Sequence, residues 1–240
     1  MGARGLNQRG LATGNQRGLP LISDATTRQA PISESDIEAG VGFLIAQEPR
    51  FGAVIKTHGL PPARCVENCL PSLLKIITEQ LISLQAADAI WQRIESSLHP
   101  FAPEEIFARS EAELKSLGLS GAKARSFIAL SQAVATGDLN FHALAKMGDE
   151  DALRKLMSLP GIGPWTADIY LLTALGRTDA CPSGDLALQI AAQHLLEMDE
   201  RPTPKDFLAL AEAWRPWRSV AARLLWSHYR GLKGITQRVN

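Results

Sequence analysis

The spacing of apolar residues is helical from residue 33 to the end of the chain. Apolar positions recur every three or four residues, and no stretch shows the strict alternation of a strand. Ser, Pro and Gly divide this pattern into segments, because Ser caps helix starts, Pro fits a first turn and Gly ends helices. The sequence therefore predicts an all-α fold. The segments expected to be helical are 33–47, 50–57, 71–80, 83–94, 104–109, 111–117, 122–135, 149–156, 164–175, 185–196, 204–214 and 214–226.

The first 32 residues differ from the rest in composition. They are rich in Gly, Arg, Asn and Gln and show little periodicity. Such a stretch cannot bury enough apolar surface to offset the entropy of ordering it, so we expect residues 1–32 to form a disordered or loosely ordered leader.

Composition and charge limit the class of protein. The chain has 240 residues, 45% of them hydrophobic, enough for one sizeable core or for two packed subdomains. No apolar run reaches the ~18 residues of a membrane span, no signal peptide opens the chain, and three scattered cysteines suit a reducing cytoplasm. Net charge is zero, but residues 201–240 hold eight Lys and Arg against two Asp and Glu. This basic end fits a nucleic-acid partner, and it fits a solvated surface equally well.

The most informative stretch lies between two expected helices and reads Leu159-Pro160-Gly161-Ile162-Gly163-Pro164-Trp165-Thr166. Pro160 ends the first helix because it has no N–H to donate, and Pro164 suits the first turn of the second. Gly161 and Gly163 permit a tight turn and leave the free N–H groups at the helix start open to an anion. The stretch is therefore a candidate phosphate site.

This stretch, together with Pro182-Ser183-Gly184-Asp185-Leu186, resembles the helix-hairpin-helix superfamily of DNA glycosylases, and within it the AlkA-type DNA-3-methyladenine glycosylases. Three further segments are similar to that family: 76–87 around Gln80-Leu81, 117–124, and 214–226 from Trp214 to Trp226. The resemblance covers residues 36–232. It implies one domain, 33–240, in which two helical subdomains flank a cleft, with roughly 70–180 in one and 33–69 plus 181–240 in the other.

The resemblance implies that Asp185, twenty residues after Trp165, is the catalytic residue of an enzyme that releases damaged bases. The base must leave the duplex stack, and the sugar becomes positively charged as the bond to the base breaks. A fixed carboxylate stabilises that charge and activates water. Asp185 is also a candidate helix N-cap, and the two roles agree because a helix N-terminus favours a negative charge.

The resemblance also implies an aromatic base pocket. Bases methylated at a ring nitrogen are cationic, and aromatic rings bind cations. Trp226 and then Trp165 are the expected walls, each otherwise an ordinary core tryptophan. Ile169 stands where some relatives have an aromatic pocket residue, which leaves the lesion range open. Trp165 occupies the position of the lysine nucleophile of bifunctional members; because a Schiff base needs an amine, we expect a monofunctional enzyme.

Several residues are candidate contacts to DNA. Leu81 stands where AlkA-type relatives place a leucine that fills the gap left by a flipped base; without the resemblance it would be an ordinary core leucine. Lys123 is expected to be a solvated lysine rather than a phosphate contact. The other candidates for binding DNA are Gln80, Gly161, Gly163, Thr166 and Arg218.

The resemblance implies damaged double-stranded DNA as the partner, no membrane, a monomer, and a bacterial-type, nucleoid-associated cytoplasmic location. No cofactor is required, and no four-cysteine iron–sulfur cluster is expected because only Cys181 lies in the second half. In relatives, hairpin carbonyls at the positions of Met157, Leu159 and Ile162 hold Na⁺ or K⁺. Two alternatives stay open: a hairpin module that only binds DNA, needing neither Asp185 nor a Trp226 pocket, and a glycosylase for another damaged base.

Overall fold

The computed structural model describes residues 30–234, and this part of the chain contains helices and no strand. The predicted all-α class is confirmed. The helices are α1 Glu34–Gln47, α2 Phe51–His58, α3 Leu70–Glu79, α4 Leu84–Leu98, α5 Pro103–Phe107, α6 Glu111–Ser116, α7 Gly121–Ala135, α8 Phe141–Lys146, α9 Asp149–Met157, α10 Pro164–Thr173, α11 Leu186–Leu195, α12 Pro204–Ala211, the 3₁₀ helix η2 Glu212–Trp214 and α13 Arg218–Leu232.

The helix starts follow from short polar side chains that bind free backbone N–H groups. Ser33, Ser83, Ser110 and Ser120 are the N-caps of α1, α4, α6 and α7, and each side-chain oxygen accepts a hydrogen bond from the N–H three residues later. In α5, α10 and α12 a proline occupies the first turn, where its missing N–H costs nothing. None of the helices within residues 30–234 combines the length and hydropathy of a membrane span.

The start of one helix was predicted wrongly, and another helix was not predicted. Trp214 does not begin the last long helix, because it ends η2, and α13 begins only at Arg218 after Pro216. Pro216 has no N–H with which to continue a helix from the preceding turn. The sequence reasoning also missed α8, a short helix that Asn140 caps by accepting a hydrogen bond from the N–H of Ala143.

The predicted leader extends too far into the chain. Residues 1–29 lie outside the described residues, but Ile32 is only 4% exposed. Its backbone N–H donates to the carbonyl of Gly176 over 3.0 Å. The ordered core therefore includes the last residues of the segment that composition assigned to the leader.

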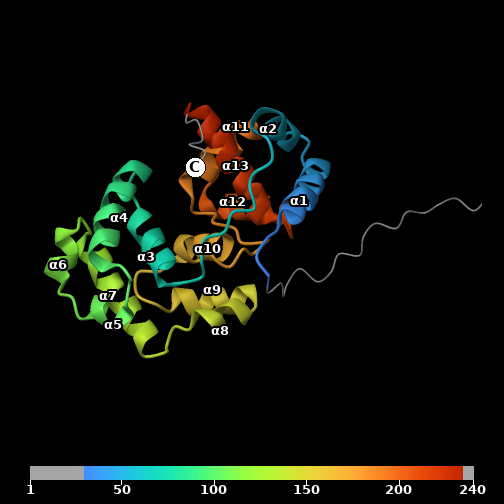
Figure 1. The fold of residues 1–240 in the computed structure, drawn as a ribbon. Coiled ribbons are helices and arrows are strands. Elements are labelled where there is room, and N and C mark those ends of the chain that lie inside the picture. Colours follow the sequence, from blue (N-terminus) through green and yellow to red (C-terminus); the bar gives the residue numbers. More distant parts are fainter. Residues whose placement is uncertain (1–29, 235–240) are drawn as a thin grey trace, which may run out of the picture.

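Two groups of helices meet at the hairpin (Figure 1). One group is built on α7, against which α3, α5 and α6 pack, with α4 on α3. The other is built on α13, which contacts α1, α2 and α11. Helix α10 packs against both α9 and α3, and the buried apolar residues of the two groups form one continuous cluster. The hairpin between α9 and α10 is therefore fixed where the two groups join.

Three histidines meet where α2, α11 and α13 come together: His58, His194 and His228. Nδ1 of His194 lies 3.0 Å from Nε2 of His228, and the rings of His58 and His228 have centroids 6.5 Å apart. Burial lowers the pKa of His228, and repulsion from His194 and His58 lowers it further. No group of three or more His, Cys, Asp or Glu residues within 30–234 has the arrangement of a metal site.

We expect this cluster to make the fold sensitive to mild acid. Because the pKa of His228 is lower in the folded than in the unfolded chain, the unfolded state binds protons more readily, and stability is lost as the pH falls below about 6.5. His228→Gln should reduce the drop in Tm between about pH 7.5 and pH 5.5. The exposed His142→Gln is the matched control, and an identical drop in both variants would contradict this account.

Candidate active site

The hairpin glycines differ in what the fold requires of them. Gly161 has φ +82°, in the left-handed region, and a Cβ there would lie 2.7 Å from Cβ of Ser126 on α7. Gly163, the N-cap of α10, has φ −93°, and a Cβ there would meet no atom within 4 Å. Of the two hairpin glycines, Gly161 is therefore the one that must lack a side chain for this fold to form. The missing side chain at 163 leaves the N–H groups at the start of α10 open to a ligand.

Gln80 joins the end of α3 to this hairpin. Its side-chain Nε2 donates to Oγ1 of Thr166 over 2.7 Å and to the carbonyl of Gly161 over 3.2 Å. Thr166 is 2% exposed, so its hydroxyl is buried and accepts its hydrogen bond from within the protein. Of the residues expected to contact DNA, Gln80 and Thr166 thus hold the hairpin against α3.

Leu81 follows directly and is fully exposed, at 103% of its reference area, with φ +58°. A left-handed backbone at a leucine costs roughly 1–2 kcal/mol of folding free energy. The side chain of Leu81 is exposed, so its burial does not offset that cost. Lys123 stabilises the turn, because its Nζ donates to the carbonyls of Thr78 and Gln80 over 2.8 and 2.7 Å. The sequence reasoning expected a solvated lysine at 123; this contact spans more than forty residues and leaves no local signal.

The carboxylate of Asp185 is held from two sides. Its Oδ1 accepts a hydrogen bond from the N–H of Leu188 over 3.1 Å, which makes Asp185 the N-cap of α11. Its Oδ2 accepts a hydrogen bond from Nε1–H of Trp165 over 3.0 Å. A carboxylate has about four lone-pair sites, so this arrangement fixes the group and leaves acceptor positions for water. The structure thus brings the predicted catalytic residue against the hairpin.

We expect Trp165→Phe to free Asp185, and thereby to lower about tenfold the rate of the base release that the resemblance implies. The phenyl ring keeps most of the packing but removes the one N–H that donates to Oδ2, and a hydrogen bond to a charged group contributes about 1.5–3 kcal/mol. Single-turnover rates at saturating enzyme measure this effect. If Trp165 instead lines the base pocket, the variant should raise KM and leave the rate unchanged.

The other pocket candidates lie on α10 and α13. Ile169 is buried one turn after Trp165, and Trp226 is half-buried in the middle of α13. These two residues stay predictions as walls of a base pocket.

Arg218 lies in a different environment from the one expected for a DNA contact. Its side chain is 10% exposed, and its guanidinium forms an ion pair with Asp179 over 2.8 Å. It also donates to the carbonyl of Asp179 and to the carboxylate of Glu212. A phosphate would have to displace these partners, so the structure indicates that Arg218 fixes the start of α13 to the loop before Asp185.

Asp168 is a half-buried carboxyl near the site, and it was not among the residues predicted from the sequence. It lies one turn after Trp165, and the N–H of Cys181 donates to its Oδ1 over 3.4 Å. Burial raises the pKa of Asp168 to about 7, only partly offset by this hydrogen bond and by Arg218. Asp168 therefore provides an internal comparison for the role of Asp185.

Comparison with known proteins identifies the family of this chain. The model of the HhH-GPD superfamily of base excision DNA repair proteins matches residues 74–216. The putative DNA-3-methyladenine glycosylase YfjP of Bacillus subtilis is 33% identical over 187 residues, covering 73% of this chain and 64% of that protein. DNA-3-methyladenine glycosylase 1 of Schizosaccharomyces pombe is 28% identical over 171 residues, covering 69% of this chain and 75% of the relative. The chain thus spans just under two thirds of the length of the first relative.

Solved structures agree with this assignment. A DNA-3-methyladenine glycosidase from Bacillus halodurans superposes with a TM-score of 0.69 at 30% identity, covering 81% of this chain and 91% of that one. The S. pombe 3-methyladenine DNA glycosylase Mag1, solved with abasic DNA, has a TM-score of 0.73 at 24% identity and covers 81% of this chain and 97% of its own. The second likeness concerns the fold alone. With the family model matching more than half of its residues, the chain belongs to the HhH-GPD superfamily of base excision DNA repair proteins.

Proposed function

We propose that this protein is a monofunctional DNA glycosylase that hydrolyses the N-glycosidic bond of alkylated purines in double-stranded DNA. The observation that carries the proposal is the carboxylate of Asp185, fixed by the N–H of Leu188 and the indole of Trp165 beside the glycine turn. The names of the relatives support the same activity, since they are DNA-3-methyladenine glycosylases.

The geometry supports a separate role for each of the site residues. The N–H groups at Gly163 and the start of α10 bind backbone phosphate, and exposed Leu81 fills the gap left by the flipped nucleotide. The bond from C1′ to the base nitrogen then breaks, and its electron pair neutralises the methylated, cationic base. Asp185 stabilises the positive sugar and accepts a proton from the water whose oxygen bonds to C1′. Trp226 is the proposed aromatic wall for the base.

The product is an abasic site in an intact strand. Strand cleavage by a lyase needs an amine that forms a Schiff base with the sugar. Trp165 offers an indole N–H, and this N–H is already donated to Asp185. Base release without strand cleavage is therefore part of the proposal.

The test uses duplexes that each carry one lesion: 3-methyladenine, 7-methylguanine, hypoxanthine or ethenoadenine. After incubation with the protein, half of each sample is treated with alkali, which cleaves abasic sites. Strand breaks that appear only after alkali, with the two methylated purines, support the proposal. Breaks without alkali contradict the monofunctional assignment, release of only neutral lesions changes the substrate class, and tight binding with no release favours a hairpin module that only binds DNA.

We extend the proposal to a monovalent cation at the hairpin, held by the carbonyls of Met157, Leu159 and Ile162. Within the described residues the carbonyls of Met157 and Ile162 accept no hydrogen bond, and that of Leu159 accepts a long one, 3.3 Å from the N–H of Ile162. Carbonyl oxygens are ligands that hard cations favour, so the donor set fits Na⁺ or K⁺. Such an ion would add positive charge beside the DNA phosphate. We further propose that the protein acts as a monomer in a bacterial-type, nucleoid-associated cytoplasmic setting.

A further inference from the structure

One face of α13 carries aromatic and basic side chains that the rest of the protein covers only in part. At 100° per residue, Trp226, Tyr229, Arg230 and Lys233 project within a sector of about 100°. The first three are half-buried and Lys233 is exposed. The ammonium of Lys233 lies 5.9 Å from the centroid of the Tyr229 ring. Interleaved aromatic rings and cations of this kind are typical of surfaces that bind nucleic acid.

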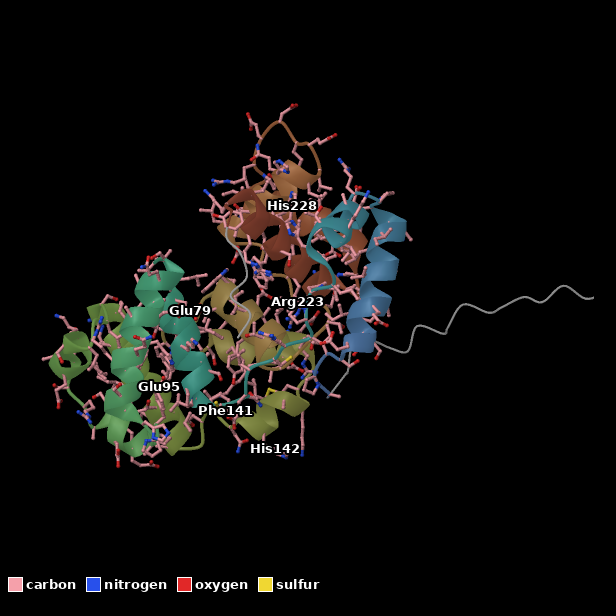
Figure 2. All side chains as sticks on the ribbon, turned by 45° about the horizontal axis from the view of Figure 1, so that its top comes forward. Glu79, Glu95, Phe141, His142, Arg223 and His228 are labelled. Carbon is pink, nitrogen blue, oxygen red and sulfur yellow. The ribbon has the colours of Figure 1, made fainter. Side chains whose placement is uncertain are left out.

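Nearer its N-terminus, the same side of α13 contacts the rest of the protein. Arg223 lies at the centre of the molecule, where α13 approaches α10 (Figure 2), and its guanidinium donates to the carbonyls of Pro62, Arg64 and Leu172. Arg230 follows seven residues later, which is two turns and about 10 Å along the axis on nearly the same side. Arg223 donates to three backbone carbonyls, although its buried Nε has no acceptor, whereas Arg230 donates to a single hydroxyl.

Arg230 is a half-buried cation with little to bind. Its NH2 group donates to Oγ of Ser227 over 2.9 Å, while its buried Nε has no acceptor. No carboxylate within residues 30–234 pairs with it, in contrast to Arg218. Burial lowers the pKa of Arg230, but a guanidinium stays charged at any physiological pH. With one neutral acceptor and no carboxylate partner, this guanidinium keeps donor capacity for an anionic ligand such as a phosphate.

We infer that Arg230 binds a backbone phosphate of the DNA strand next to the flipped nucleotide, and that Trp226, Tyr229 and Lys233 complete this contact surface. This inference rests on the proposed function. A phosphate is the anion that such a substrate brings, and its oxygens match the planar fork of a guanidinium. A contact to the base itself is the less favourable alternative, because methylated purines are cationic and would be repelled.

The experiment measures binding of a duplex with one abasic site by fluorescence anisotropy at several salt concentrations. Arg230→Gln should weaken binding about fivefold or more at low salt and reduce the slope of log Kd against log salt by about 0.9, the value for one phosphate contact. The single-turnover rate of 7-methylguanine release at saturating enzyme should change less than twofold. Arg109→Gln is the control, because this half-buried arginine lies beside α6 at the outer edge of the other helix group (Figure 1), and Glu113 is its one ion-pair partner within residues 30–234.

Three outcomes would overturn the inference. The first is an unchanged salt slope in Arg230→Gln. The second is an equal change in Arg109→Gln, and the third is an altered preference among lesions with unaltered affinity, which would mean contact with the base. If Arg230→Gln does not fold, Arg230→Lys replaces it, with the salt slope retained and a two- to threefold loss of affinity expected. A wild-type protein that binds the abasic duplex as predicted yet releases no base would contradict the proposed function alone.

Discussion

Asp185→Asn is expected to lower the single-turnover rate of base release by about 100- to 1,000-fold while leaving the affinity for abasic DNA nearly unchanged. The amide is close in size to the carboxylate, and Asn is as good an N-cap as Asp, so it can accept the hydrogen bond from Leu188 and keep α11 in place. It cannot carry the negative charge that faces the developing sugar cation, nor accept a proton from water. Loss of one preorganised electrostatic group of this kind typically costs two to three orders of magnitude in rate.

Asp168→Asn is the matched control for this variant. Because burial raises the pKa of Asp168 to about 7, the folded state holds this proton more tightly than the unfolded chain, and stability falls as the pH rises from about 4 to 7. The neutral amide removes that penalty. We expect the control to be more stable at about pH 8, by roughly 1–3 kcal/mol, and to release bases at a rate close to that of the wild type.

Rates and urea denaturation of both variants separate catalysis from folding. A large loss of rate in both would show that any change to a carboxylate in this region disturbs the site. Release by Asp185→Asn at the wild-type rate would remove Asp185 from the chemistry and leave it as the N-cap of α11 alone.

Local chemistry explains how much of the fold could be predicted. Helix starts at Ser33, Ser83 and Ser120 followed from the side chains that cap them, because each cap contacts an N–H only three residues away. The start of α13 could not be predicted in the same way. It depends on Arg218, which pairs with Asp179 across 39 residues, and a pairing of that range has no mark in the local pattern.

The same difference between local and long-range contacts applies to the candidate site. The resemblance assigned Trp165 and Asp185 to the same site, but it did not indicate that the indole N–H donates to the carboxylate. Periodicity alone would have buried Leu81, whereas a left-handed backbone at the end of α3 turns it fully outward. The lysine that stabilises this turn, Lys123, comes from α7. The family resemblance predicts that Leu81 acts as a wedge, which stays a prediction, but the resemblance did not give the backbone conformation that exposes it.

The two hairpin glycines should respond in opposite ways to alanine. At Gly161 the fold requires a left-handed φ, which costs an alanine roughly 1–2 kcal/mol, and the alanine methyl group would collide with Ser126. We expect Gly161→Ala to lose more than about 2 kcal/mol of folding stability, and DNA binding to fail with it. At Gly163 the φ is ordinary and the space is empty, so Gly163→Ala should change stability by less than about 1 kcal/mol.

Binding should nevertheless suffer at Gly163. If its N–H and those at the start of α10 hold a phosphate, an alanine methyl group occupies the path of the approaching strand, and affinity for duplex DNA should fall about tenfold or more in a well-folded protein. Urea denaturation and anisotropy on the same preparations measure the two quantities. A folded Gly163→Ala protein with wild-type affinity would mean that the phosphate lies elsewhere, because nothing within the described structure requires that residue to lack a side chain.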